Sequence, residues 1–281
     1  MSEPSPSPLP FSDQTVAFIG GGNMASALIG GLLRQGLPAG RVQVIEPFAA
    51  TRDKLLADHG VRAQERAGPE LAAPDLVVWA VKPQTFREAA RAVAPFTTAA
   101  LHLSVAAGIR SDSIAAWLDS ERVVRSMPNT PALVGRGITG LYARPGISQE
   151  DRALVEQVIA TTGEHRWVTK EPQLDAVTAL SGSGPAYVFY LLEAMQNAGA
   201  DMGLPPEQAL QLAVATFTGA AALAAASEDP PEVLRERVTS KGGTTHAALS
   251  TMEQDRIGPL FVRAMHAAHR RAAELGDEFG G

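Results

Sequence analysis

Short apolar runs alternate with amphipathic segments from residue 15 to about residue 170. Residues 75–81, DLVVWAV, are almost continuously apolar, which is typical of a strand buried on both faces of a parallel sheet. Residues 23–35 instead place leucine and isoleucine side chains on one face of a helix. Strands that alternate with helices in this way predict a doubly wound α/β sheet. The predicted strands cover residues 15–19, 41–46, 75–81, 101–105, 122–126, 138–143 and 164–168, and the predicted helices cover residues 23–35, 49–58, 111–118, 149–161 and a segment after Pro83.

From about residue 170 onward the strand-like runs disappear, and long helical segments take their place. We expect helices at residues 185–200, 207–226 and 245–275, separated by glycine and proline turns. The sequence therefore predicts a Rossmann-type doubly wound domain at residues 13–170, followed by an all-α domain at residues 171–281. Because these helices are rich in small apolar residues, we expect the second domain to form a homodimer.

Composition and charge narrow the possible functions. The net charge is −6 and no long basic block occurs, which argues against nucleic acid as a partner. The chain has no cysteine, so thiol catalysis, cysteine-ligated metals and disulfides are excluded. We expect no metal site, because His266 and His269 share a helix face without supporting acids.

Two segments bear on localisation. Residues 1–12 are rich in proline and serine and lack the apolar run of a signal peptide, so we expect a disordered tail. Residues 212–226 are apolar but short, and we expect a buried helix there rather than a membrane span. The sequence predicts a soluble cytoplasmic protein with no membrane partner.

A glycine turn follows the first predicted strand. Residues 20–25, GGGNMA, fit the pattern G-x-G-x-x-A between a strand and a helix. Gly20 permits the tight turn, Gly22 lets the backbone approach a pyrophosphate, and Ala25 allows close packing of helix on strand. Free N–H groups at the helix start would face the phosphates. A glycine-rich turn without a ligand is the alternative, but the flanking elements favour dinucleotide binding.

The end of the second predicted strand bears on the choice of cofactor. Glu46 stands where an acid would bond the ribose hydroxyls of NAD and repel a 2′-phosphate. Arg52 and Arg66 lie nearby in the sequence and could support NADP instead. The residues alone leave this choice open.

Five further stretches matter when they are taken together. They are Ala80-Val81-Lys82-Pro83-Gln84, Ser104-Val105-Ala106-Ala107-Gly108, Met127-Pro128-Asn129-Thr130-Pro131, Leu180-Ser181-Gly182-Ser183-Gly184-Pro185-Ala186-Tyr187 and Val238-Thr239-Ser240-Lys241-Gly242-Gly243-Thr244-Thr245.

In this order and spacing, from about Val16 to Leu275, the chain resembles the pyrroline-5-carboxylate reductase family. That family reduces the cyclic imine 1-pyrroline-5-carboxylate to L-proline with NAD(P)H, the last step of proline synthesis. Its members pair a Rossmann domain with a helical dimerisation domain, and their dimers commonly assemble into decamers. The resemblance implies the same activity and assembly here, with NADPH as the cofactor and NADH as a possible substitute.

The resemblance also implies which residues form the site. Thr245 would be catalytic, and the substrate would contact Glu171, Ser240, Gly242, Gly243, Thr244 and Thr245. The cofactor would contact Gly20, Gly22, Asn23, Met24, Ala80, Val81, Lys82, Pro83, Ala106, Ala107, Gly108 and Asn129, to which Glu46 is added from its place at the end of the second predicted strand. Two positions depart from the family pattern: Lys241 stands where members often have proline, and Ala67 where some have asparagine.

The expected chemistry depends on geometry more than on a strong acid. A hydride must approach the imine carbon closely, and the imine nitrogen needs a hydrogen-bond partner, for which Thr245 Oγ is the candidate. Backbone N–H groups at Gly243 and Thr244 and the Ser240 hydroxyl would hold the substrate carboxylate. Taken alone, the Gly-Gly-Thr-Thr stretch favours a helix with a threonine cap, whereas taken with the glycine turn and the other matching stretches it favours a substrate loop.

Two other functions compete with this interpretation. The first is a dehydrogenase of the 3-hydroxyacid kind, which relies on a helical lysine base, but the second domain offers only Lys241 in a loop. The second is a non-catalytic, nucleotide-sensing scaffold, against which the intact stretch from Ser240 to Thr245 argues.

Overall fold

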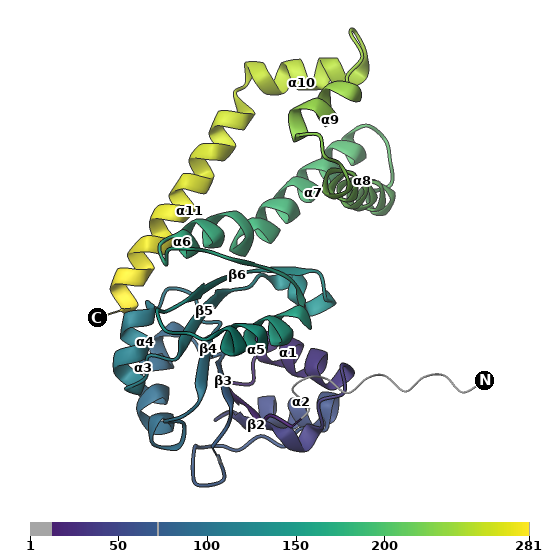
Figure 1. The fold of residues 1–281 in the computed structure, drawn as a ribbon. Coiled ribbons are helices and arrows are strands. Elements are labelled where there is room, and N and C mark those ends of the chain that lie inside the picture. The colour runs from purple at the N-terminus through teal and green to yellow at the C-terminus, as the bar shows by residue number, and fades with distance from the viewer. Residues whose placement is uncertain (1–12, 72, 281) are drawn as a thin grey trace, which may run out of the picture. The chain divides into compact units, whose positions relative to one another are not determined.

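The computed structural model describes residues 13–71 and 73–280, so the tail predicted at residues 1–12 lies outside the described residues. The chain divides into two compact units (Figure 1). The first contains the described residues up to Ser183 together with those from Ala268 onward, and the second contains Gly184–Ala267. The domain boundary predicted near residue 170 stays a prediction.

A seven-stranded sheet forms the centre of the first unit, in the order β2-β1-β3-β4-β5-β6-β7. Neighbouring strands run parallel except β5 and β6, which are antiparallel. The predicted doubly wound α/β sheet is confirmed, and each strand ends within two residues of its predicted bounds. The strands are β1 (Val16–Ile19), β2 (Val42–Ile45), β3 (Leu76–Trp79), β4 (Leu101–Ser104), β5 (Val123–Met127), β6 (Gly137–Ala143) and β7 (Gly163–Trp167).

Helices cover both faces of this sheet (Figure 1). Side chains alternate along each strand, so in β1 Val16 and Phe18 enter one apolar core and Ala17 and Ile19 enter the other. The first core packs against α1 (Asn23–Arg34), α2 (Ala49–His59) and α5 (Gln149–Ala160), and the second against α3 (Pro83–Val93) and α4 (Ser111–Leu118). The unit also contains shorter elements and the end of α11 (Ile257–Phe279). The shorter elements are the 3₁₀ turns η1 (Ala39–Arg41), η2 (Ala94–Phe96) and η3 (Thr130–Val134), helix α6 (Gln173–Val177) and the π-helical turn η4 (Thr178–Gly182).

The second unit is entirely helical. It contains α7 (Gly184–Asp201), α8 (Pro206–Ala226), α9 (Pro231–Arg237), α10 (Thr244–Gln254) and the first part of α11. Helices α7 and α8 approach closely, because a Cβ added at Gly199 would lie 2.7 Å from the Cβ of Ala209. The rings of Tyr187 and Phe261 meet edge to face at 5.7 Å between centroids.

The single helix predicted at residues 245–275 is wrong. The chain forms two helices there, α10 and α11, separated at Asp255 and Arg256. Arg256 has a positive φ of 57°, which a continuing right-handed helix does not allow. Pro259 then falls in the first turn of α11, where its missing N–H costs no helical hydrogen bond.

The prediction that the helix at residues 212–226 is buried is also wrong within the single chain. The helix is present as part of α8, but it is largely exposed there. Among the described residues, α8 is the one helix that is long and apolar enough to cross a membrane, and 11% of its most apolar window is buried within the chain. Leu212 is 54% exposed and Leu223 is 71% exposed. A continuous apolar surface of this kind is typical of a helix that another surface covers.

A buried histidine in the sheet has a lowered pKa. His102 in β4 is 1% exposed, and its Nδ1 accepts a hydrogen bond of 3.2 Å from Trp79 Nε1. Burial, with a smaller contribution from the charge of Arg122, lowers the pKa of His102 from 6.5 to about 4. The folded chain therefore holds His102 in its neutral form near pH 7.

We predict that His102 makes the fold sensitive to mild acid. As pH falls below 6.5 the unfolded chain takes up a proton that folded His102 resists, so stability declines as pH drops from 6.5 towards 4. Between pH 7 and pH 5 this contribution is about 2 kcal/mol. In His102→Asn the amide oxygen can still accept from Trp79, but the proton-binding ring is gone. Denaturant unfolding should therefore show that this variant loses about 2 kcal/mol less stability between pH 7 and pH 5 than the unmodified protein. Equal losses in the two proteins would contradict the assignment.

Candidate functional site

The glycine turn after β1 is shaped by a backbone contact. Gly20 has a φ of +94°, and a Cβ at this position would lie 2.5 Å from the carbonyl oxygen of Ala80. Gly20 N donates to Ile45 O at 2.8 Å, and Ala80 N donates to Ile19 O at 2.8 Å. The turn is therefore fixed between the ends of β2 and β3, and only glycine fits.

The start of α1 leaves room for a ligand. Gly22 is the N-cap residue, and no side chain of the described residues accepts a hydrogen bond from the N–H groups of this first turn. A Cβ at Gly22 would meet no described heavy atom within 4 Å, whereas Ala25 is fully buried. Open space in front of free N–H groups at a helix start fits a pyrophosphate.

Glu46 is held in place at the end of β2. Its side chain is almost fully buried, with Oε2 accepting from Gly21 N and Oε1 from Phe48 N, both at 2.8 Å. The Arg52 guanidinium donates to Glu46 O at 2.9 Å and to Pro47 O at 2.7 Å, so it lies against the same turn. The side chain of Arg66 is 88% exposed. The acid is fixed beside the glycine turn, and one arginine lies close to it.

The loops after β3, β4 and β5 carry the remaining predicted cofactor contacts. Lys82 is the N-cap residue of α3 and Pro83 its first residue. Ala106 is nearly buried, and its N–H donates to Ser104 Oγ at 3.3 Å. Gly108 has a φ of +71°, with the Cβ of Leu275 3.2 Å from where its own would be. Asn129 Oδ1 accepts from Ile138 N at 3.0 Å and so fixes the start of β6.

The sheet brings these residues to one edge. Strands β2, β1, β3, β4 and β5 run parallel, so their carboxyl ends all lie at the same edge. The chain order reverses at β1, which lies between β2 and β3, and open α/β sheets bind ligands at such a switch point. The predicted cofactor residues all follow the carboxyl ends of these strands: Gly20, Gly22, Asn23, Met24, Glu46, Ala80, Val81, Lys82, Pro83, Ala106, Ala107, Gly108 and Asn129.

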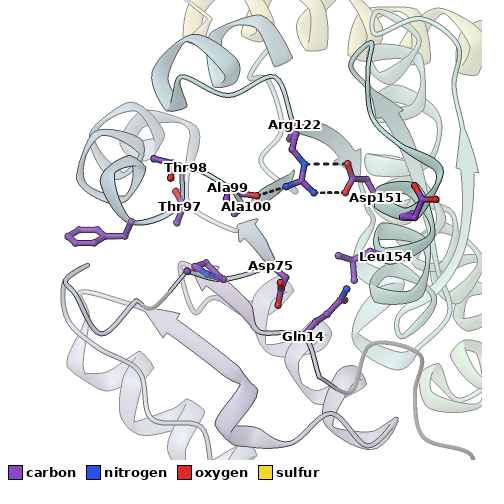
Figure 2. A pocket seen from close by; sticks show the side chains of 13 residues that line it. Gln14, Asp75, Thr97, Thr98, Ala99, Ala100, Arg122, Asp151 and Leu154 are labelled. Atoms are coloured by element: carbon purple, nitrogen blue, oxygen red, sulfur yellow. Dashed lines mark hydrogen bonds and ion pairs between the residues drawn. The ribbon is translucent and has the colours of Figure 1, made fainter.

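A pocket of about 360 Å³ lies at the opposite edge of the sheet (Figure 2). Two of its charged groups pair: Arg122 donates to both carboxylate oxygens of Asp151, at 2.6 and 3.4 Å, and also to the carbonyl of Ala99. Asp75 accepts from the backbone N–H of Thr15 at 2.8 Å. Because these groups are already bonded within the chain, we interpret this pocket as part of the packing between the strand starts and α5 and not as the candidate site.

The predicted substrate loop belongs to the second unit. Gly242 has a φ of +77°, Gly243 N donates to Ser240 O at 3.0 Å, and Gly243 is the N-cap residue of α10. The alternative of a threonine cap is wrong, because Thr244 and Thr245 already lie within the helix. No side chain in the described part of the chain caps α10. The loop thus presents a second glycine-led helix start that suits an anion.

The Glu171 carboxylate is engaged within the first unit. It accepts from Arg125 Nη1 at 2.5 Å and from the N–H and Oγ of Ser111, each at 2.6 Å. Its predicted contact with substrate stays a prediction. Arg125 was not predicted as a site residue, although a charged residue inside the strand VVRSM was a visible signal.

The fold and this edge of the sheet define a dinucleotide-binding protein of the Rossmann class. Over 271 residues the chain is 43% identical to a pyrroline-5-carboxylate reductase of Pseudomonas aeruginosa, with 96% of this chain and 99% of that protein covered. The chain belongs to the pyrroline-5-carboxylate reductase family.

Further comparisons agree with this assignment. Residues 171–275 match the family model described as pyrroline-5-carboxylate reductase dimerisation, and residues 15–108 match the one described as NADP oxidoreductase coenzyme F420-dependent. A pyrroline-5-carboxylate reductase structure from Coxiella burnetii is 36% identical, with a TM-score of 0.86 and coverage of 93% of this chain and 98% of that one. A Plasmodium falciparum pyrroline carboxylate reductase solved with NADP bound is 26% identical, with a TM-score of 0.82 and coverage of 94% and 99%. The exposed apolar helices of the second unit thus lie in the dimerisation region of the family.

We predict that alanine at the two outer glycines of the turn acts on different properties: on dinucleotide binding at Gly22 and on stability at Gly20. Gly22→Ala should leave thermal stability unchanged, because its Cβ meets open space, but weaken dinucleotide binding about tenfold or more by filling the approach to the pyrophosphate. Gly20→Ala should cost at least about 1 kcal/mol of unfolding free energy, because of its positive φ and the contact with Ala80. Thermal unfolding and fluorescence titration with NADPH measure both. Unchanged affinity in Gly22→Ala would show that the dinucleotide binds elsewhere.

Proposed function

We propose that this chain catalyses the reduction of 1-pyrroline-5-carboxylate to L-proline with NAD(P)H. One observation carries the proposal: a chain 43% identical to a pyrroline-5-carboxylate reductase has two uncapped, glycine-led helix starts, one at the switch point of the sheet and one at residues 240–245. The first suits a dinucleotide and the second a carboxylate. A 3-hydroxyacid dehydrogenase lacks support, because Lys241 is the only lysine after residue 170 and lies in a loop.

The residues at the carboxyl edge of the sheet would bind and orient the cofactor. N–H groups after Gly22 would take the pyrophosphate, with Asn23 and Met24 beside it, and the strand-end segment from Ala80 to Pro83 would line the ribose. Ala106, Ala107 and Gly108 would lie along the nicotinamide, supported by Asn129. The bound dihydronicotinamide supplies the hydride.

The loop from Ser240 to Thr245 would bind the substrate. The backbone N–H groups of Gly243 and Thr244 and the Ser240 hydroxyl would hold the carboxylate, with Gly242 allowing the turn. The positive charge of Lys241 would add attraction for this anion. Thr245 Oγ would hydrogen-bond the imine nitrogen, and so fix its carbon for attack.

NADPH is the proposed cofactor, with NADH as a substitute. A family model described as NADP oxidoreductase coenzyme F420-dependent matches residues 15–108, and a relative was solved with NADP bound. The Glu46 carboxylate acts against a 2′-phosphate, whereas the neighbouring Arg52 acts in its favour. Their balance sets the preference.

The proposed assembly is a homodimer formed through the helical region, with dimers joined into a decamer in the cytoplasm. The exposed apolar side chains of α7 and α8 support burial against a second copy, with neither a membrane nor nucleic acid as partner. Sedimentation as a monomer at micromolar concentration would contradict this assembly.

The direct test is the oxidation of NADPH and NADH by pure protein with 1-pyrroline-5-carboxylate, alongside a 3-hydroxyacid with the oxidised cofactors. We expect turnover of the imine and formation of L-proline. Turnover of the hydroxyacid alone would favour the dehydrogenase, and cofactor binding without any turnover would favour a scaffold.

We predict that Thr245→Ala lowers kcat about 100-fold while the dissociation constant of NADPH stays unchanged, because the hydroxyl would act on the substrate. Thr251→Ala is the matched control, since Thr251 lies on the same helix and its hydroxyl donates to Ala247 O at 3.2 Å. Steady-state kinetics and fluorescence titration separate the two effects. A comparable loss of NADPH binding in Thr245→Ala would refute the assigned role.

We predict that Glu46→Gln raises the ratio of kcat/KM for NADPH to that for NADH about tenfold, since it removes a negative charge beside the 2′ position. Asp53→Asn, an exposed acid on α2, is the control and should leave the ratio unchanged. An unchanged ratio in Glu46→Gln would show that Glu46 does not select the cofactor.

A further inference from the structure

A buried cluster of charged and polar side chains surrounds the base of the loop after β4. Ser104 ends β4 and pairs with Arg125 of β5 in the sheet register. Arg125 is 5% exposed, and its guanidinium lies 2.5 Å from the Glu171 carboxylate. Glu171 in turn accepts from Ser111, the first residue of α4. The path from Ser104 through Arg125 and Glu171 to Ser111 therefore closes a ring around residues 105–110.

Glu171 acts as the N-terminal cap that α4 lacks locally. The N-cap residue of α4 is Arg110, and no side-chain cap bond is made from its own position within the described residues. The Glu171 carboxylate replaces that cap from 60 residues away, by accepting both the N–H and the hydroxyl of Ser111. A carboxylate at a helix start is also stabilised by the helix dipole.

A second ion pair fixes the same loop from beside the first. Arg110 donates to Asp175 at 2.9 Å and to Ala273 O at 3.4 Å. Gly108, two residues earlier, packs against Leu275. The loop is thus held at its last residues by α6 and by the end of α11.

We propose that Arg125, Glu171 and Ser111 are positioning residues that fix the Ala106–Gly108 turn against which the nicotinamide would lie. This inference rests on the proposed function, since the turn is part of the proposed cofactor site. A buried ion pair is weak evidence for stability, because apolar residues of similar volume often replace it without loss. Its presence next to a turn that must be placed to within about 1 Å points instead to positioning.

The decisive variant replaces both charges, Arg125→Met with Glu171→Leu. Removing one partner would strand a buried charge and strongly destabilise the protein, whereas the double replacement leaves no charge unpaired and loses only the cap on Ser111. We expect a thermal midpoint close to that of the unmodified protein, kcat at least about tenfold lower and KM for the imine unchanged. Hydrogen exchange of residues 105–111, measured without cofactor, should become faster.

The matched control is Arg122→Met with Asp151→Leu. This pair has the same chemistry and lies in the same unit, but at the opposite edge of the sheet (Figure 2). We expect it to leave kcat and the exchange of residues 105–111 unchanged. Ser111→Ala is the second test, because it removes one hydroxyl while both charges stay paired; it should accelerate exchange at residues 105–111 and lower kcat by a smaller factor.

Each outcome decides the inference. Unchanged exchange of residues 105–111 in the double variant, or in Ser111→Ala if the double variant does not fold, overturns it. A higher KM for the imine at unchanged kcat also overturns it and assigns Glu171 to direct substrate contact. If the unmodified protein does not reduce the imine at all, but the double variant still exchanges faster at residues 105–111, positioning is supported and the proposed function is refuted.

Discussion

The space between the ends of β1 and β3 is too small for a side chain, and the site at the carboxyl edge depends on this constraint. Gly20 turns where any Cβ would lie 2.5 Å from the Ala80 carbonyl. That tight turn leads directly into α1, which has no side-chain cap and starts beside the open space at Gly22. The same close approach brings the end of β2, and with it Glu46, to the glycine turn.

The two edges of the sheet treat their polar groups differently. At the amino edge, Arg122, Asp151 and Asp75 are bonded to one another or to backbone groups. At the carboxyl edge, the starts of α1 and α3 have no side-chain caps among the described residues. The uncapped starts of α1 and α3 thus leave backbone N–H groups available for a ligand at the carboxyl edge, even though Glu46 and Asn129 there are bonded to backbone groups.

The sequence predicts the parts of this structure that depend on local pattern. Buried parallel strands such as Leu76–Trp79 are continuously apolar, and the glycine turn has a fixed spacing, so both were found from residues alone. The prediction failed where the deciding partner is distant or lies outside the chain. Glu171 bonds to residues 46 and 60 positions away, and the apolar surface of α8 has little cover within its own chain. The break at Arg256 could have been predicted, because the polar residues 253–256 interrupt the apolar pattern there and Pro259 follows three positions later.

We expect the dinucleotide to bind at the carboxyl edge of the sheet and only there. Hydrogen–deuterium exchange of the assembled protein, with and without saturating NADPH, locates the bound cofactor. We predict slower exchange at residues 19–25, 80–83 and 105–110, with no change at residues 97–100 and 151–154, which line the pocket at the opposite edge. Protection at the amino edge, or none at residues 19–25, would contradict binding at the carboxyl edge alone.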